Sequence, residues 1–213
     1  MTAPWAAGSP GAGTGLAEDG TSAEDAAWPE DPFEVLAAWL PANDDPARPL
    51  MTLSTVSADG WPDARIVLLS ELDADGLYFH TDSRSRKIAE VDATGRAALV
   101  LHLPDQARQV VVQGTVEPAD PEEEARVYAV RGDYLRTLAW VNTDELAAAP
   151  LGERIAAWAA FEGGPDLAPP STWTGRRVRP TQVRFWAGRT DAPSRRVCYT
   201  LTDAGWERDV RAG

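Results

Sequence analysis

The segment 51–81 constrains the fold more than any other part of the sequence, because it holds three β-forming runs in close succession. Residues 51–56 and 65–69 are rich in β-branched and aliphatic side chains, and Ala58-Asp59-Gly60 between them has turn-forming chemistry. A third run, 77–81, follows after a short polar stretch. Three such runs with short connections predict an antiparallel β-meander.

A helix start follows the third run directly. Asp82-Ser83-Arg84-Ser85 supplies capping side chains, and Arg86 and Lys87, the only lysine in the chain, open a helical segment. A helix N-terminus flanked by hydroxyl groups and cations can bind an anion such as phosphate. Arg65, on the neighbouring strand, would add a third cation. A solvated helix start needs the same residues, so the pattern alone leaves both interpretations open.

The rest of the chain predicts further short strands with helices inserted between them. Such an order favours a β-barrel with helical decoration over a βαβ sheet, and no internal repeat is visible. Helices are expected at 32–40, 121–130, 135–140, in a short segment capped by Thr143, and at 151–161. Strands are expected at 97–103, 108–117, 176–179, 182–186, 196–201 and 206–211.

Charge and composition divide the chain into two parts. The 213 residues suffice for one domain with a real core, and their formal net charge is −13. Six acids and no Lys or Arg lie in the first 32 residues, which leaves −7 for the remainder (−13 + 6). Residues 1–30, rich in Gly and Ala, are expected to form a disordered acidic tail, although either Trp5 or Trp28 could dock on the body. Residues 31–213 are expected to form the domain.

The composition also argues against several classes of function. An acidic body disfavours nucleic acid or an anionic membrane as a partner, because both require a basic face. Cys198 is the only cysteine, so no intrachain disulfide can form, and a reducing cytoplasm is the expected location. No apolar run approaches 18 residues, and no signal-peptide pattern opens the chain. His80 and His102 are the only histidines, and no metal-ligand spacing is present.

Four stretches carry a family resemblance: "MTLSTVSADGWPDARIVLLSELDADGLYFHTDSRSRK", "RAALVLHLPDQARQVVVQGTVE", "FWAGR" and "RRVCYT". From about Asp31 to the C-terminus the chain resembles the pyridoxamine 5′-phosphate oxidase family of FMN-binding split-barrel flavoproteins. The resemblance implies a mainly β, α+β fold: a split β-barrel of Greek-key type with peripheral helices. It also implies a homodimer with FMN at the subunit interface.

The resemblance assigns cofactor contacts to particular residues. FMN needs cations and donors for its phosphate, an apolar wall for its ring, and a donor or positive charge at the N1–C2=O edge. By resemblance, Trp186 and Arg196 reach this edge from the partner subunit. The implied cofactor-binding residues are Arg65, Thr81, Arg86 and Lys87 for the phosphate, Val67, Leu68 and the adjacent Ile66 beside the ring, Gln109, Trp186 and Arg196 at its edge, and His80, to which no particular contact is assigned.

The implied substrate pocket departs from the family pattern. Tyr128 and Arg131 match the family's phosphate-binding Tyr and Arg. Ser70 stands where the family has Lys, and Leu135 where it has Ser. Ala192 and Ser194 stand where it has Arg and His. Losing two cations predicts roughly two to four orders of magnitude weaker binding of a phosphorylated vitamer.

Three functions remain open at this point. The first is an FMN-dependent oxidase of a small nitrogen-containing or dihydro-heterocyclic metabolite in specialised biosynthesis, and relatives that oxidise dihydrophenazines accommodate the altered pocket. The second is a genuine pyridoxamine or pyridoxine 5′-phosphate oxidase of vitamin B6 metabolism. The third is a non-catalytic flavin-binding protein. The flavin ring accepts the hydride itself, so no residue is assigned as an obligate proton-transfer group.

Overall fold

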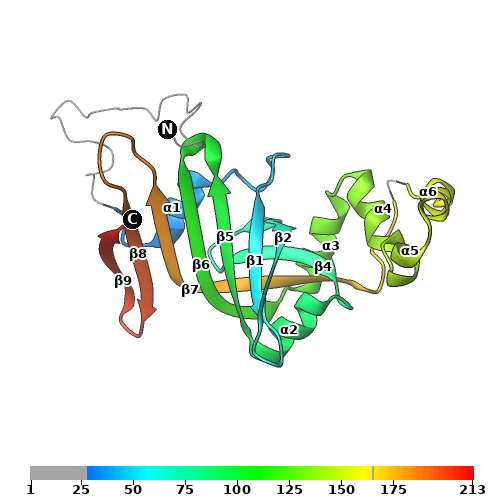
Figure 1. Ribbon diagram of the computed structural model, residues 1–213, viewed down its shortest axis with the longest axis horizontal. Coiled ribbons are helices and arrows are strands. Elements are labelled where there is room, and N and C mark those ends of the chain that lie inside the picture. The colour runs from blue at the N-terminus through cyan, green and yellow to red at the C-terminus, as the bar shows by residue number, and fades with distance from the viewer. Residues whose placement is uncertain (1–27, 165) are drawn as a thin grey trace.

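The computed structural model describes residues 28–164 and 166–213, in which a curled antiparallel sheet forms an incomplete barrel with helices around it (Figure 1). This is the predicted α+β split barrel. The helices are α1 (Pro32–Trp39), α2 (Arg86–Thr94), α3 (Pro121–Ala129), α4 (Asp133–Val141), α5 (Asp144–Ala148) and α6 (Leu151–Ala160), with a 3-10 turn at Pro104–Gln106. The strands are β1 (Leu50–Val56), β2 (Pro62–Leu68), β3 (Glu71–Leu72), β4 (Leu77–Asp82), β5 (Arg96–Leu103), β6 (Arg108–Pro118), β7 (Trp173–Ala187), β8 (Arg195–Thr202) and β9 (Gly205–Ala212).

The sheet has the order β2-β1-β5-β6-β7-β4-β3, and β8 and β9 extend it beside β7. The predicted β1–β2 hairpin is confirmed, with Leu50 opposite Leu68 and Val56 opposite Pro62. The predicted three-stranded meander is wrong, because β4 pairs with β3 and β7 and not with β2. Four consecutive residues of β4, Leu77 to His80, are buried. Because β4 is covered on both faces, it fits a place inside the sheet, between β3 and β7, and not one beside the β1–β2 hairpin.

Strand β7 is the longest element and joins the two halves of the sheet. It pairs with β6 from Arg176 to Ala187, with β4 through its first half, and with β8 through its second half. The sequence predicts two strands here, broken near Pro180, and this division is wrong. Pro180 faces Gly114 at a register shift in β6, so the missing N–H falls at a bulge and the strand continues.

The main core is formed by side chains of β1 and of β4 to β8 together with side chains of α1 and α2. Asp31 caps α1 by accepting a hydrogen bond from the Phe33 N–H, and Val35 and Leu36 are buried. Trp39 packs edge-on against Phe185 of β7, with ring centroids 5.2 Å apart. Trp28 also packs on Phe185, at 5.8 Å. The alternative that Trp28 docks on the body is therefore the one observed, while residues 1–27 lie outside the described part of the chain.

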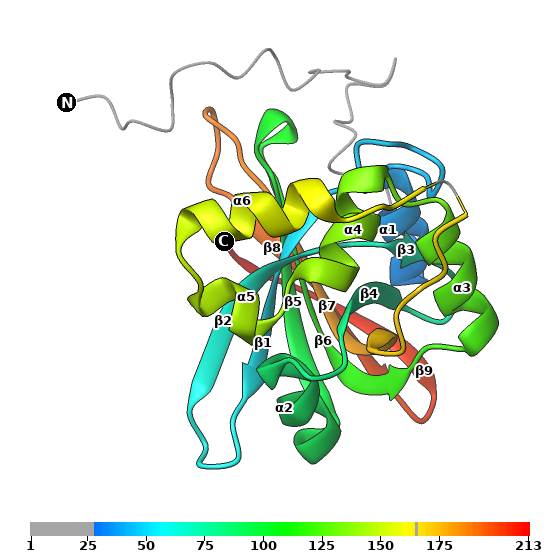
Figure 2. The same cartoon turned by 90° about the vertical axis from the view of Figure 1, so that its right-hand side faces the viewer.

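Helices α3 to α6 form a group on one side of the sheet, with α4, α5 and α6 in front of it in Figure 2. α3 lies against β7, since the Trp173 indole N–H donates to the Glu124 carbonyl at 3.0 Å. On α6 and α4, several large apolar side chains are exposed, among them Ile155 and Tyr134. No helix among the described residues is long and apolar enough to cross a membrane.

Candidate active site

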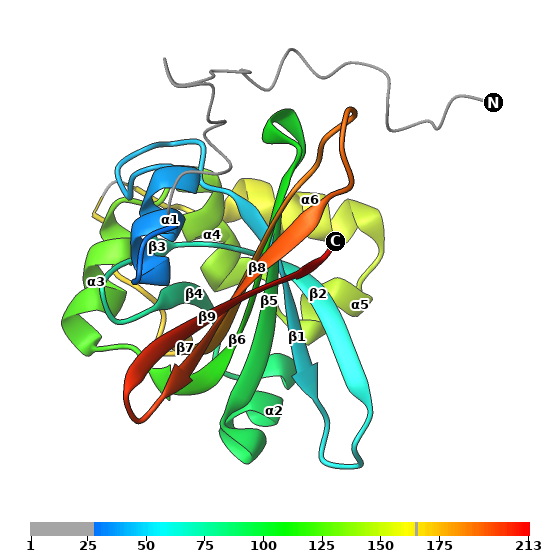
Figure 3. The ribbon, with the colours of Figure 1, turned by 90° about the vertical axis from the view of Figure 1, so that its left-hand side faces the viewer.

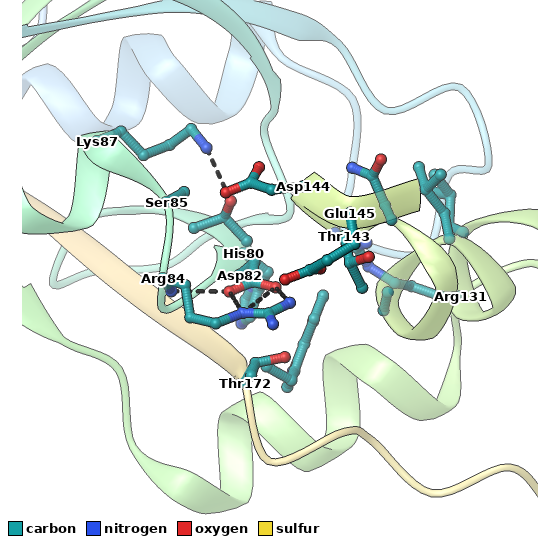
Figure 4. Close-up of a pocket in the computed structure, with 16 residues that line it drawn as sticks. His80, Asp82, Arg84, Ser85, Lys87, Arg131, Thr143, Asp144, Glu145 and Thr172 are labelled. Atoms are coloured by element: carbon teal, nitrogen blue, oxygen red, sulfur yellow. Dashed lines mark hydrogen bonds and ion pairs between the residues drawn. The ribbon is translucent and has the colours of Figure 1, made fainter. Parts of the chain in front are cut away.

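A cavity of about 440 Å³ opens where the end of β4, the start of α2 and helices α4 and α5 meet (Figure 4). Five of the residues implied by the resemblance line it, which places cofactor and substrate candidates in one space. The predicted residues in its wall are His80, Thr81, Lys87, Arg131 and Leu135. The other lining residues are Asp82, Arg84, Ser85, Leu138, Ala139, Asn142, Thr143, Asp144, Glu145, Thr172 and Trp173.

One end of the cavity presents donors at the N-terminus of α2. Ser85 is the N-cap residue, but its hydroxyl makes no capping bond and is buried without a partner among the described residues. Lys87 Nζ donates to Thr81 Oγ1 at 3.0 Å (Figure 4). Burial lowers the pKa of Lys87, and the nearby Arg65 lowers it further. An orphaned hydroxyl, a desolvated ammonium group and a helix N-terminus together fit a phosphate group.

Arg65 and Arg86 lie outside this cavity wall and share a buried carboxylate. Arg65 Nη2 contacts Glu90 Oε2 at 3.0 Å, and Arg86 Nε contacts Glu90 Oε1 at 2.7 Å. The Thr55 hydroxyl also donates to Glu90, which is 4% exposed. Glu90 thus binds the two guanidinium groups that the resemblance assigns to phosphate. Glu90 was not among the residues predicted from the sequence, although its i, i+4 spacing from Arg86 was a usable signal.

The Glu90 cluster predicts a pH dependence of stability. The Thr55 hydrogen bond, followed by Arg86 and Arg65, holds the pKa of Glu90 below its usual value against the effect of burial. A carboxylate with a lowered folded-state pKa stabilises the protein above its unfolded pKa, near 4.3, and this stability is lost as the pH falls through the folded pKa. Glu90→Gln should therefore lower the melting temperature more at pH 7 than at pH 3. An equal loss at both values would contradict the assignment of the charge to Glu90.

The other end of the cavity carries an unpaired cation on an aromatic wall. The Arg131 guanidinium lies 4.3 Å from the centroid of the Trp173 ring, and its Nε is buried without a partner. The Arg131 side chain makes no hydrogen bond or ion pair within the described residues, and burial lowers its pKa to about 10. It remains charged at neutral pH, so it can receive an acidic group of a ligand.

Tyr128, the other residue kept from the family pattern, does not line the cavity. Its side chain is buried beside Trp173, at 5.3 Å between ring centroids. Its hydroxyl accepts a hydrogen bond from the Trp140 indole N–H at 3.2 Å. In this structure Tyr128 supports the aromatic wall from behind. Leu135, at the family's serine position, does line the cavity and contributes apolar surface.

Ser70, at the family's lysine position, is buried, and its hydroxyl is already in hydrogen-bond contact with another side chain. Its hydroxyl is 2.9 Å from His80 Nδ1, and His80 Nε2 is 3.0 Å from Glu123 Oε2. The His80 ring stacks on Trp173 with an interplanar angle of 13°. The Ser70–His80–Glu123 chain therefore fixes the orientation of an imidazole in the cavity wall, and position 70 offers no cation. Ala192 and Ser194 lie in the β7–β8 connection and not in this wall.

A second cavity, of about 210 Å³, lies on the β6–β7–β8 face of the sheet. Gln109 is opposite Trp186, and Trp186 is opposite Arg196, so the three ring-edge candidates are adjacent in one chain. The resemblance divides them between two subunits, with Gln109 on one and the other two on its partner. The structure groups all three instead, and none of them lines the first cavity. Arg184 lines the second cavity as well, and the sequence analysis missed it.

The proposed ring-wall residues of β2 differ in exposure. Ile66 is 60% exposed, and Val67 and Leu68 are half-buried. They lie on the edge strand of the sheet, beside neither cavity wall. Among the described residues no cluster of three or more metal-ligating side chains occurs.

Sequence and structure comparisons agree on the class of protein. Residues 42–187 match the family model described as pyridoxamine 5′-phosphate oxidase. Residues 173–212 match the model of the pyridoxine 5′-phosphate oxidase C-terminal dimerisation region. The chain therefore belongs to the pyridoxamine 5′-phosphate oxidase family.

Two relatives are named pyridoxine/pyridoxamine 5′-phosphate oxidase. The protein of Caulobacter vibrioides is 36% identical over 184 residues, which is 83% of this chain and 82% of that protein. The protein of Thermosynechococcus vestitus is 39% identical over 184 residues, with 84% and 87% covered.

Two solved structures are similar in fold. PhzG from Burkholderia lata 383, in complex with tetrahydrophenazine-1-carboxylic acid, superposes with a TM-score of 0.73 at 25% identity, covering 87% of this chain and 94% of that one. A pyridoxamine 5′-phosphate oxidase-related, FMN binding protein from Nostoc punctiforme has a TM-score of 0.64 at 20% identity, covering 77% and 88%.

Proposed function

We propose that the chain is an FMN-dependent oxidase of a small planar heterocycle that carries one acidic group. The observation that carries the substrate class is the unpaired Arg131 guanidinium over Trp173. Arg131 supplies one cation to this end of the cavity, whereas the family pattern would add a second at position 70, where the structure has the occupied Ser70 hydroxyl. One accessible guanidinium suits a carboxylate better than a phosphate dianion.

The cavity residues divide into three tasks. Lys87, Thr81 and the orphaned Ser85 hydroxyl bind the phosphate of FMN. Arg131, which lies over the Trp173 ring that His80 stacks on, orients the acidic group of the substrate. When bound, FMN supplies the redox chemistry: it accepts a hydride from the substrate and passes the electrons to dioxygen.

Helices α4 and α5 close the substrate end. Leu135, Leu138 and Ala139 of α4 present apolar atoms to the cavity and exclude water from it. Asp144 and Glu145 of α5 also line the cavity, near the Arg84 guanidinium, which is bound by Asp82 at 2.6 Å.

The protein acts as a homodimer, with each flavin site shared between two chains. Gln109, Trp186 and Arg196 line a cavity that has no residue in common with the Lys87 cavity. A ligand with its phosphate at Lys87 and its ring edge at Trp186 is best accommodated if the second group comes from a partner chain. The match of residues 173–212 to a dimerisation region supports this arrangement.

A second candidate function is a genuine pyridoxamine or pyridoxine 5′-phosphate oxidase. The names of relatives at 36% and 39% identity favour it, as does the retention of Tyr128 and Arg131. The buried Ser70 and the exposed Ala192 in place of two cations argue against it.

Anaerobic reduction of the bound flavin tests the substrate class. Purified holoprotein would be mixed with pyridoxamine 5′-phosphate, pyridoxine 5′-phosphate and a dihydrophenazine carboxylate, and the loss of flavin absorbance near 450 nm would be followed. We expect the carboxylate to reduce the flavin fastest. Faster reduction by either phosphate ester would favour the vitamin B6 reaction, and no reduction by any donor would favour a non-catalytic flavoprotein.

A further inference from the structure

The β6–β7–β8 face contains a cation that neither the family pattern nor the comparisons assign. Arg184 lines the second cavity together with Gln109, Val111, Trp186, Arg196 and Gly213, and its Nε is buried without a hydrogen-bond partner among the described residues. On β7, Arg184 and Trp186 are two residues apart and therefore point to the same side of the sheet. Arg184 is opposite Val111 on β6 and opposite Cys198 on β8.

The side chains that line this cavity carry two positive charges and no negative charge. Within the described residues neither the Arg184 nor the Arg196 side chain makes a hydrogen bond or an ion pair. The nearest acid in the register, Asp209 of β9, is opposite Cys198 and is bound by Arg211 at 2.6 Å. Two neighbouring guanidinium groups repel each other, and a buried unpaired donor costs free energy. Arg196 is exposed and Arg184 is half-buried, so both guanidinium groups can be reached by an anionic ligand.

The occupant with the best chemical match is the flavin ring edge. The ring becomes negatively charged along its N1–C2=O edge on reduction, and Gln109 and Trp186 offer a donor and an aromatic wall beside the two cations. We propose that Arg184 acts with Arg196 as a second positive charge at this edge, and that it stabilises the reduced flavin. The proposal rests on the proposed placement of the flavin ring at Trp186.

Sulfite binding and the reduction potential test this role without measuring turnover. Sulfite adds its sulfur lone pair to the oxidised ring and leaves a negative charge on it, so a cation at the ring edge tightens sulfite binding. In Arg184→Gln holoprotein we expect the sulfite Kd to rise about tenfold. If the equilibrium between oxidised and two-electron-reduced flavin also changes tenfold, the midpoint potential of the variant is about 30 mV lower than that of the wild type. Arg184→Lys should restore most of both values, because it keeps the charge.

Arg179→Gln is the matched control, since it removes an exposed charge from the same strand outside the cavity. It should leave both values unchanged. Folding is checked by the FMN absorbance spectrum and by sedimentation. If Arg184→Gln binds FMN as a dimer with wild-type sulfite affinity and potential, while Arg196→Gln loses both, then the inference about Arg184 is wrong and the flavin placement stands.

Three further outcomes would also overturn the inference. If Arg184→Gln weakens only the binding of a carboxylate substrate, then Arg184 binds substrate. If it converts the dimer to monomers, Arg184 pairs with a partner carboxylate. If neither Arg184→Gln nor Arg196→Gln changes the flavin, the proposed ring placement at Trp186 is wrong together with the inference.

Discussion

Riboflavin should bind this protein about 10²- to 10⁴-fold more weakly than FMN. The two ligands differ only in the phosphate, which we place at Lys87 and the N-terminus of α2. Two charge-assisted hydrogen bonds of about 1.5–3 kcal/mol each give this range. Fluorescence quenching of each flavin by the apoprotein measures the two dissociation constants. The preference should be large because Lys87 and Ser85 are already desolvated, so phosphate binding removes little additional water from them.

The same preference should depend on Lys87. Lys87→Met is expected to weaken FMN by about 10- to 150-fold and to leave riboflavin unchanged, because it removes one of the phosphate contacts. Arg96→Gln provides the control, since Arg96 is an exposed cation just beyond the other end of α2. Equal losses for FMN and riboflavin in Lys87→Met would place Lys87 at the ring and not at the phosphate.

Arg131→Leu should separate stability from binding. Burial of an unpaired guanidinium is costly, and its replacement by an apolar side chain against Trp173 should raise stability by about 1 kcal/mol, or about 2–4 °C in melting temperature. The same change should weaken a carboxylate substrate by about 10- to 150-fold, because the charge-assisted bonds are lost. Calorimetry and substrate titration of the holoprotein measure the two effects.

The neutral amide of the same substrate is the matched ligand for this variant. Its affinity should change by less than about threefold, since it makes no ion pair with Arg131. A lower melting temperature in Arg131→Leu, together with equal losses for acid and amide, would show that the guanidinium is structural. Arg131→Lys should retain part of the acid binding because it keeps the positive charge.

Local chemistry made the elements of this fold predictable from the sequence. Three features each depend on a few neighbouring residues: the N-cap at Asp31, the turn at Gly60, and the turn of the β8–β9 hairpin, which ends at Gly205 (φ +111°). The pairing of β4 and the continuity of β7 were not predictable in this way. The first depends on pairing between β4 and β7, about 100 residues apart in the chain, and the second on pairing between β6 and β7, about 65 residues apart. The pattern of residues within one strand does not show which distant strand it pairs with.

The candidate site shows the same division. Lys87 was found because a helix start follows directly after β4, and Thr81 was assigned by the family resemblance. The hydrogen bond of the Ser70 hydroxyl could not be predicted from the sequence. Its partner is His80, and His80 in turn contacts Glu123, and these residues belong to different elements. Arg184 was missed because alternation on a strand identifies a face but does not show whether an acid lies beside it. Three-dimensional neighbours decide whether a cation is already paired, and that decides whether it can bind a ligand.

The uninterrupted course of β7 has a genetic consequence. One end of this strand carries Trp173, in the wall of the Lys87 cavity, and the other carries Trp186, on the β6–β7–β8 face seen in Figure 3. In the proposed dimer each chain therefore contributes to two different flavin sites. Two inactive alleles, one altered at Arg131 and the other at Arg196, would then complement each other. In a mixed dimer one flavin site contains both altered residues, whereas the other site contains neither and is intact.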